Sequence, residues 1–302
     1  MKNGDSTKRL IIHIGTHKTG TTAIEKFLSL NRLIFKKYDI YIPKTGLSGK
    51  YDGHHNLAWE VHGDTPLFNT KFGTLNDLKK ELNSINHKTI VISSDYFECF
   101  YNNADKLKKL KDFADSLGLE TYIFVCFRKE TEYIPMIYEE LLKGGLTVNF
   151  KDFIDSIIKN GEIHYKYYGG WNFCFDYNKI IFGFSEIFGK EFIKVFDYVT
   201  PAESMFLKLL NIENDEEFIF PGKVNQPLPS FVVKILRPYN LVSERVDILN
   251  FIRRLGAPVI RNAIKLFVIL GLFSKVSSSV ELNPVQKELI ANRFSFFTPR
   301  HD

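Results

Sequence analysis

The sequence has few cysteines, and they lie far apart. Its 302 residues include Cys99, Cys126 and Cys174, with no CxxC pair and no series of short intervals. This pattern is not typical of a disulfide framework or of a zinc site. We therefore expect reduced thiols, no metal, and a protein of the cytoplasm.

Long hydrophobic runs are also missing. The longest, Leu266 to Phe273, is bounded by Lys265 and Lys275, and it is far shorter than the roughly 20 residues that cross a bilayer. We predict no transmembrane segment. The run fits either a buried or partner-packed helix or a peripheral contact with a membrane surface. The basic N-terminal end leads through a short apolar run into a glycine loop, which indicates a first strand and not a signal peptide.

A strong charge of one sign is absent as well. Forty basic and 35 acidic side chains leave a net charge of +5, which suits anionic ligands but does not indicate a nucleic-acid partner. With 44% hydrophobic residues, 19 glycines and 11 prolines, the composition is that of a folded globular chain.

Strand-like and helix-like segments alternate in the first two thirds of the chain. Near-continuous apolar runs predict four strands, and charged segments with helical spacing separate them. The strands are expected at residues 9–14, 89–94, 121–127 and 192–198, and the helices at 22–31, 75–85, 104–117 and 131–143. This alternation predicts an α/β fold with a mostly parallel central sheet.

After about residue 200 the strand signals fade and helical ones continue. They include residues 203–211, 230–240, 243–273 and 283–294, the last opened by Pro284. We expect one domain over residues 8–302, with an α/β core at 8–200 and a helical C-terminal elaboration at 201–302.

The segment HIGTHKTGTT, residues 13–22, follows the first predicted strand and leads into a predicted helix. Such a turn directs backbone N–H groups and the positive end of the helix dipole at one point, which suits a phosphate or a sulfate. Gly15 and Gly20 permit a tight path, Lys18 adds a positive charge, and the hydroxyls of Thr21 and Thr22 can donate to phosphate oxygens.

The position of the lysine distinguishes this loop from a triphosphatase loop. In the pattern GxxxxGK[ST] the lysine follows the second glycine and the hydroxyl binds magnesium. Here Thr21 follows Gly20 and the lysine lies inside the glycine pair, at Lys18. This arrangement argues against a magnesium-triphosphate site.

HIGTHKTGTTAIEKFL resembles the 5′-phosphosulfate loop of sulfotransferases that use 3′-phosphoadenosine 5′-phosphosulfate (PAPS), particularly the bacterial and carbohydrate-acting ones. The resemblance implies a three-layer fold like that of P-loop NTPases. It also implies that Lys18 stabilises charge on the oxygen between phosphate and sulfuryl group. The loop residues that would bind the cofactor are Gly15, Thr16, His17, Lys18, Thr19, Gly20, Thr21 and Thr22.

A second segment, FVCFRKETEYIPMIYEELLKGG, resembles the family's 3′-phosphate signature. The resemblance implies that Arg128 binds the 3′-phosphate and places Tyr138 at an aromatic position of the site. The family's serine is replaced by Met136, which puts one hydrogen bond to this phosphate in doubt. A looser match at residues 223–240 implies cofactor contacts for Lys223 and Asn225, although a helix-capping role fits equally well.

Transfer to an acceptor requires a general base. The candidates are His55, Asp95, His17, Glu25 and His54. His55 is the first choice, because the resemblance places a histidine at the start of this helix and an imidazole titrates near neutral pH. Asp95 fits a base, an acceptor-binding carboxylate or a helix cap. His17 fits either an acceptor contact or packing on the loop, and His54 is expected to be a solvated neighbour.

The resemblance thus implies an enzyme that transfers a sulfuryl group from PAPS to a hydroxyl, or less readily an amine, of a carbohydrate or glycolipid, releasing 3′-phosphoadenosine 5′-phosphate (PAP). A bacterial enzyme acting on polysaccharide precursors fits this interpretation. Two alternatives stay open. One is a P-loop nucleotide kinase or triphosphatase; the other is a non-catalytic PAP-binding or scaffold protein, which the replacement at Met136 keeps open. The sequence leaves the oligomeric state undetermined.

Overall fold

A computed structural model describes residues 8–49, 51–165, 171–199, 201–213, 216–222, 236–238, 240–241 and 280–294. The chain divides into two compact units. The first contains residues 1–129, 162–224 and 296–302, and the second contains residues 130–161 and 225–295. The expectation of one domain stays a prediction.

The first unit is built on a five-stranded parallel sheet with the order β2-β3-β1-β4-β7. The strands are β1 (Arg9–Gly15), β2 (Ile40–Tyr41), β3 (Thr89–Ser93), β4 (Glu120–Phe127) and β7 (Ile193–Asp197). All four strands expected from the sequence are present, and β2 was missed because a two-residue strand carries too little pattern.

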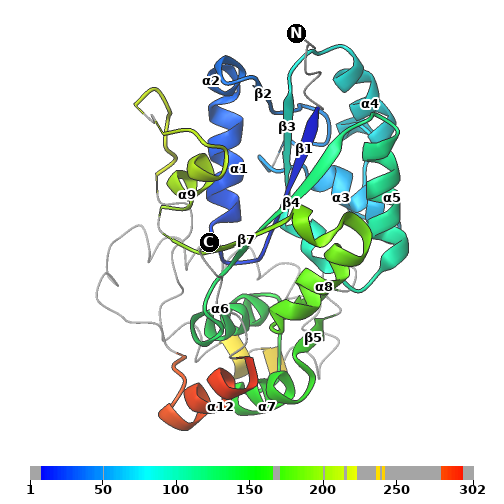
Figure 1. Ribbon diagram of the computed structural model, residues 1–302. Helices are drawn as coiled ribbons and strands as arrows, with labels where there is room; N and C mark the ends of the chain where they lie inside the picture. The colour runs from blue at the N-terminus through cyan, green and yellow to red at the C-terminus, as the bar shows by residue number, and fades with distance from the viewer. Residues whose placement is uncertain are drawn as a thin grey trace. The chain divides into compact units, whose positions relative to one another are not determined.

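Helices cover both faces of this sheet (Figure 1). On one side lie α1 (Thr21–Leu30), α2 (Arg32–Lys37) and α9 (Ala202–Leu209), and on the other lie α3 (His55–His62), α4 (Leu75–Asn83) and α5 (Ala104–Asp115). The unit also contains α8 (Tyr177–Phe188) and the short 3₁₀ helices η1 (Thr70–Phe72), η2 (Asp95–Phe100) and η4 (Lys190–Phe192). This is the expected α/β fold, with the P-loop arrangement of strand, glycine loop and helix at β1 and α1.

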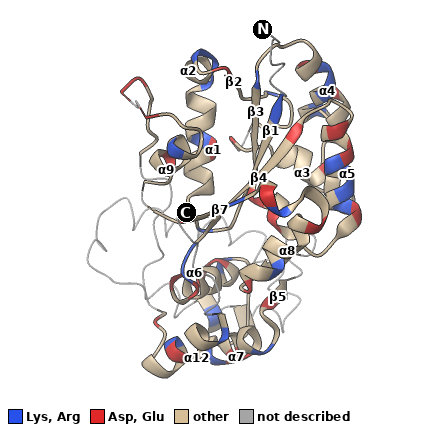
Figure 2. Ribbon diagram, in the orientation of Figure 1, with Lys and Arg blue, Asp and Glu red and all other residues tan. Residues whose placement is uncertain are grey.

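The core on the α1 side forms because α1 buries Ile24, Phe27 and Leu28 at helical spacing. They pack with β1 and with α9 through Ile11 and Phe206 in one cluster. On the opposite side, α5 buries Leu107, Leu110 and Ala114 and exposes charged residues of both signs, as Figure 2 shows.

A two-stranded antiparallel ribbon, β5 (Glu162–Tyr165) with β6 (Trp171–Cys174), completes the first unit. The second unit contains α6 (Glu130–Lys143), α7 (Phe150–Asn160) and α12 (Pro284–Phe294). The helices expected at 131–143, 203–211 and 283–294 are therefore confirmed as α6, α9 and α12. Most of 230–240 and all of 243–273 lie outside the described residues. In the described part of the chain, no helix has the length and apolar character needed to cross a membrane.

Candidate active site

The loop between β1 and α1 has an unusual backbone at three positions. Gly15 and Gly20 have φ values of 95° and 80°, and Lys18 has a φ of 59°. Only glycine adopts such values without cost, so a lysine in the left-handed region carries a strain of about 1 kcal/mol or more. The loop therefore holds Lys18 in a conformation that its own preference would not select.

Hydrogen bonds to β4 fix this loop. Both the backbone N–H and the hydroxyl of Thr16 donate to the carbonyl of Cys126, at 3.1 and 3.2 Å. The Nε of Arg128 donates to the carbonyl of Lys18 at 3.0 Å, and the guanidinium lies 3.9 Å from the ring centre of Tyr198. The strained residue is thus held by the arginine that the sequence analysis assigned to the 3′-phosphate.

The loop threonines have different environments. The hydroxyls of Thr19 and Thr21 both donate to the carbonyl of Thr16, at 2.5 and 3.0 Å, whereas Thr22 is exposed. A hydroxyl has one proton to donate. Thr21 would therefore have to release its bond to Thr16 before it could donate to a phosphate, and its expected role stays a prediction.

The N-terminal end of α1 has no side-chain cap. Gly20 is its N-cap residue, and no side chain bonds to the first turn. The first helical N–H groups that reach a backbone acceptor are those of Ala23 and Ile24, which donate to the carbonyl of Gly20. The N–H groups of Thr21 and Thr22 come before the first of these bonds along the chain. N–H groups in this position commonly bind an anion at a helix N-terminus.

A second group of polar side chains follows β3, where η2 begins. Ser94 is the N-cap of η2, and its hydroxyl accepts from the N–H of Tyr96 at 3.1 Å. Asp95 is the first residue of η2, and Gly15 is packed against it, because a Cβ on this glycine would lie 3.2 Å from that of Asp95. The glycine loop and η2 therefore lie side by side at the carboxyl ends of β1 and β3, the edge where open α/β sheets bind ligands.

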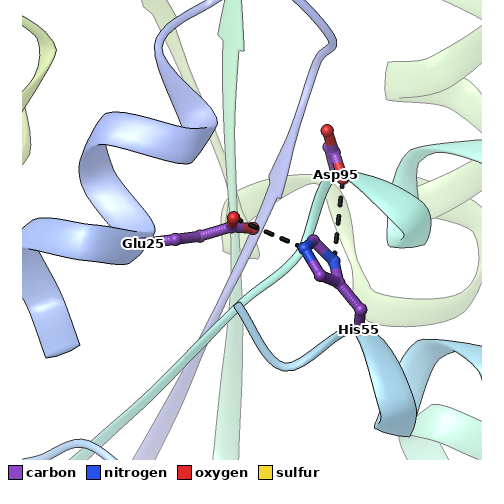
Figure 3. Close-up of side chains that lie close together, drawn as sticks. All are labelled: Glu25, His55 and Asp95. Atoms are coloured by element: carbon purple, nitrogen blue, oxygen red, sulfur yellow. Dashed lines mark ion pairs between the residues drawn. The ribbon is translucent and has the colours of Figure 1, made fainter. Parts of the chain in front are cut away.

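His55, the first choice for the base, is the first residue of α3 as expected. Its Nδ1 lies 2.7 Å from the hydroxyl of Ser94, and its Nε2 lies 3.5 Å from Oε2 of Glu25. Asp95 Oδ1 lies 3.8 Å from Nδ1. Figure 3 shows Glu25 reaching from α1, Asp95 from η2 and His55 between them. Both ring nitrogens thus face groups of the protein, and only 8% of the side chain is exposed.

Glu25, His55 and Asp95 could hold a metal ion by spacing alone, since their ligand atoms lie within 4.8 Å of one another. Burial, with Asp95 and Asp52 nearby, raises the pKa of Glu25 well above its usual value. Burial also lowers the pKa of His55. Metal ligands must be deprotonated, so the raised pKa of Glu25 opposes metal binding at these three residues in the absence of a cation. The absence of a metal stays a prediction.

His13 and His54 are buried below the site. His54 Nε2 lies 3.1 Å from the carbonyl of Pro43, and its Nδ1 accepts from the N–H of Ser93 at 3.1 Å. Burial lowers the pKa of each histidine to about 4. The expectation that His54 is a solvated neighbour is wrong. Both His54 and His55 are buried, and the contact of His54 with β3 through Ser93 could not be seen from its position next to His55.

Aromatic rings surround this group. Tyr96 contacts Trp59, Trp171 and His55 edge to face, with ring centres 5.2, 4.4 and 5.2 Å apart. The two tryptophans are almost wholly buried. Both tryptophans are therefore mainly part of the wall of the site.

Three further residues were predicted to bind the cofactor: Tyr138, Lys223 and Asn225. Tyr138 lies in the second unit, where its hydroxyl donates to the carbonyl of Val148 at 2.9 Å and its ring packs on Phe153. Lys223 and Asn225 lie outside the described residues. Their cofactor roles, and that of Tyr138, stay predictions.

Glu98 is a site residue that was not predicted from the sequence. Its side chain is fully buried, and Oε2 accepts from the backbone N–H of His17 at 3.1 Å and lies 3.0 Å from His17 Nδ1. A lone acidic residue in the apolar run after Asp95 is a usable signal, because buried carboxylates require partners.

Comparisons with known proteins add little to this geometry. No protein-family model and no curated protein matches the sequence. Among solved structures, a sulfotransferase from Alicyclobacillus acidocaldarius is similar, with 15% identity over 78% of this chain and 93% of that chain, and a TM-score of 0.38. Similarity of this degree does not establish a family or an activity.

Proposed function

We propose that the protein is a sulfotransferase that transfers a sulfuryl group from PAPS to a hydroxyl of a carbohydrate or glycolipid acceptor. The observation that carries the proposal is the glycine loop. Its lysine lies between the two glycines in a strained backbone conformation, directly before an uncapped helix N-terminus. This combination provides amide donors and one cation, which suit a phosphosulfate. The loop has no lysine after Gly20, where a triphosphate-binding loop has one.

Transfer of this kind depends on alignment and on neutralising charge, as in phosphoryl transfer. In the proposed mechanism, the N–H groups at the start of α1 bind the 5′-phosphate. Lys18 stabilises the negative charge that develops on the bridging oxygen as the sulfur–oxygen bond breaks. Arg128 and β4 hold Lys18 in its strained backbone conformation. Lys18 is therefore already positioned, and the loop needs less ordering when the substrate binds.

Arg128 has two roles in the proposal. It supports the loop through the carbonyl of Lys18, and it binds the 3′-phosphate of the same nucleotide, as the resemblance of its segment to the family implies. The hydroxyl that the family places on the following helix is replaced by Met136 in α6. Arg128 would then supply most of the binding at that end.

Calorimetric titration with PAP tests the cofactor assignment. We expect Lys18→Ala and Arg128→Ala each to weaken PAP binding by about 10- to 100-fold, because each loses a charge-assisted bond worth about 1.5 to 3 kcal/mol. Met136→Ser should bind PAP as well as the wild type or more tightly, because a hydroxyl is added where the family has one.

Matched controls are available on the same elements. Lys26→Ala removes an exposed lysine from α1, and Lys129→Ala removes the exposed neighbour of Arg128; neither should change PAP binding more than about twofold. Absence of PAP binding to the wild type would refute the proposal. Magnesium-dependent binding of ATP that is tighter than that of PAP would favour a kinase or triphosphatase instead.

A further inference from the structure

His17 is held by a buried carboxylate. Oε2 of Glu98 accepts from the backbone N–H of His17, at 3.1 Å, and lies 3.0 Å from its Nδ1. Glu98 is fully buried, so this contact is shielded from water. A carboxylate accepts but does not donate, so Nδ1 carries the proton, and the neutral ring has its lone pair on Nε2. The same logic fixes the histidine of a serine-protease triad.

The other ring nitrogen of His17 points to the more open part of the site. Nε2 lies 3.8 Å from Oδ2 of Asp95, and the two side chains are 19% and 20% exposed. His55, by comparison, is 8% exposed, with Ser94 at one nitrogen and Glu25 at the other. Of these two histidines, His17 is the one with a nitrogen available to an acceptor.

Among the described residues, the charged groups that act on His17 come from η2 and the loop, and the titratable ring of His55 on α3 also interacts with it. η2 contributes Asp95 and Glu98, and the loop contributes Lys18. From β6 the rings of Trp171 and Phe173 contact the imidazole edge to face, with centres 4.8 and 5.2 Å away. Burial and the positive charge of Lys18 both lower the pKa of His17. The negative charges of Asp95 and Glu98 outweigh these two effects, so the pKa of His17 is raised.

The position of His17 in the chain supplies the remaining argument. It directly precedes Lys18, the residue proposed to neutralise the departing oxygen. Both residues lie on the turn between Gly15 and Gly20, whereas the two ring nitrogens of His55 face Ser94 and Glu25.

We infer that His17 and Glu98 form a catalytic dyad in which His17 Nε2 accepts the proton of the attacking hydroxyl. The inference rests on the proposed function. The acceptor O–H bond breaks and its proton goes to Nε2 as the new O–S bond forms. The bond from sulfur to the 5′-phosphate oxygen breaks, and its electron pair leaves with PAP. Glu98 is the positioning residue, and Asp95 stabilises the imidazolium.

Nuclear magnetic resonance of the histidine side chains tests the dyad without any substrate. In long-range ¹H–¹⁵N spectra of the wild type, we expect His17 to show a proton on Nδ1 when neutral and to titrate above 6.5. In Glu98→Gln the pKa of His17 should fall, because the hydrogen-bonded carboxyl partner that raises it is lost. A neutral His17 with its proton on Nε2 would overturn the dyad. If Glu98→Gln does not fold, the tautomer and the pKa of His17 in the wild type are sufficient to test the dyad.

Sulfuryl transfer from ³⁵S-labelled PAPS to a panel of hexose and hexosamine methyl glycosides tests the catalytic role. We expect His17→Gln to lower kcat at least 100-fold while PAP affinity stays within about threefold. Glu98→Gln should shift the acidic limb of the kcat/KM profile to lower pH. His164→Gln, which changes an exposed histidine of β5, is the control and should retain full activity.

The outcomes separate the two proposals. If the wild type does not bind PAP, the proposed function fails, while the spectra still decide whether the dyad exists. If PAP binds but His17→Gln keeps its activity and His55→Gln loses it, His55 is the base and the inference is wrong. Equal loss of activity and of PAP affinity in His17→Gln would also overturn it, because His17 would then act only in binding the nucleotide.

Discussion

Individual residues of the loop are constrained by backbone geometry as much as by chemistry. Gly20 illustrates this, since it combines a φ of 80° with a close approach of α9. A Cβ at this position would lie 2.5 Å from that of Ala202, closer than packed carbons come. Gly20 is therefore required both by the turn and by the packing of the helix that covers α1.

Replacing Gly20 by alanine should lower the free energy of unfolding by about 2 to 4 kcal/mol, since it adds an overpacking cost to the left-handed backbone cost. Gly118→Ala is the matched control, because its φ is 64° and nothing lies within 4 Å of the added carbon. It should cost about 1 kcal/mol. Urea denaturation of both variants measures the difference, and equal losses would show that the contact with Ala202 is relieved at no cost.

Short elements, more than long ones, decide how the site is assembled. η2 has six residues, yet it supplies Asp95 and Glu98 to the site. The periodicity of α1, α4, α5 and α6 is readable from the sequence, because each spans two turns or more. A 3₁₀ segment of this length has no such signal. Which of its side chains turns inward was therefore decided by contact with β1 and the loop.

Ser94 starts η2 and also contacts His55, so Ser94→Ala should destabilise the protein by about 1 to 2 kcal/mol. Two bonds are lost, the one from the Tyr96 N–H and the one with His55 Nδ1. Ser84→Ala removes an exposed hydroxyl at the end of α4, and it should change the free energy of unfolding by no more than about 0.5 kcal/mol. Comparable losses in the two urea transitions would argue against a role for Ser94 in holding η2.

At the scale of the whole molecule, buried histidines connect stability to pH. The pKa values of His13 and His54 are lowered to about 4 in the folded state, against about 6.5 when unfolded. Below pH 6.5 the unfolded chain binds protons that the folded chain does not. The free energy of unfolding therefore falls from pH 6.5 toward pH 4, by about 3 kcal/mol for each histidine.

Glu25 opposes this trend, because a raised carboxyl pKa costs stability as the pH increases above 4.5. The decisive measurement is thus a comparison of variants. Between pH 7.5 and pH 5, His54→Gln should lose less stability than the wild type, although it is less stable at pH 7.5. The exposed His164→Gln should follow the wild type. A pH dependence of His54→Gln equal to that of the wild type would exclude His54 as the titrating group.

The sequence by itself determined the fold class and the glycine loop between β1 and α1. Four long buried strands, their helices and the glycine pair around Lys18 are local patterns, set by side-chain period and by backbone freedom within a few residues. It also named His17, His55, Asp95 and Glu25 as candidates, because the first three follow strand ends or begin a helix and Glu25 lies in the first helix after the loop.

Only the tertiary structure decided how these groups are paired. His17 and Glu98 are 81 positions apart in the chain, and Arg128 and Lys18 are 110 apart. Such contacts arise because the parallel sheet places β1, β3 and β4 side by side with their carboxyl ends together. Burial then depends on the whole fold, which is why His54 is enclosed, His55 has both nitrogens engaged, and His17 alone of the three combines a buried carboxylate partner with a partly exposed ring.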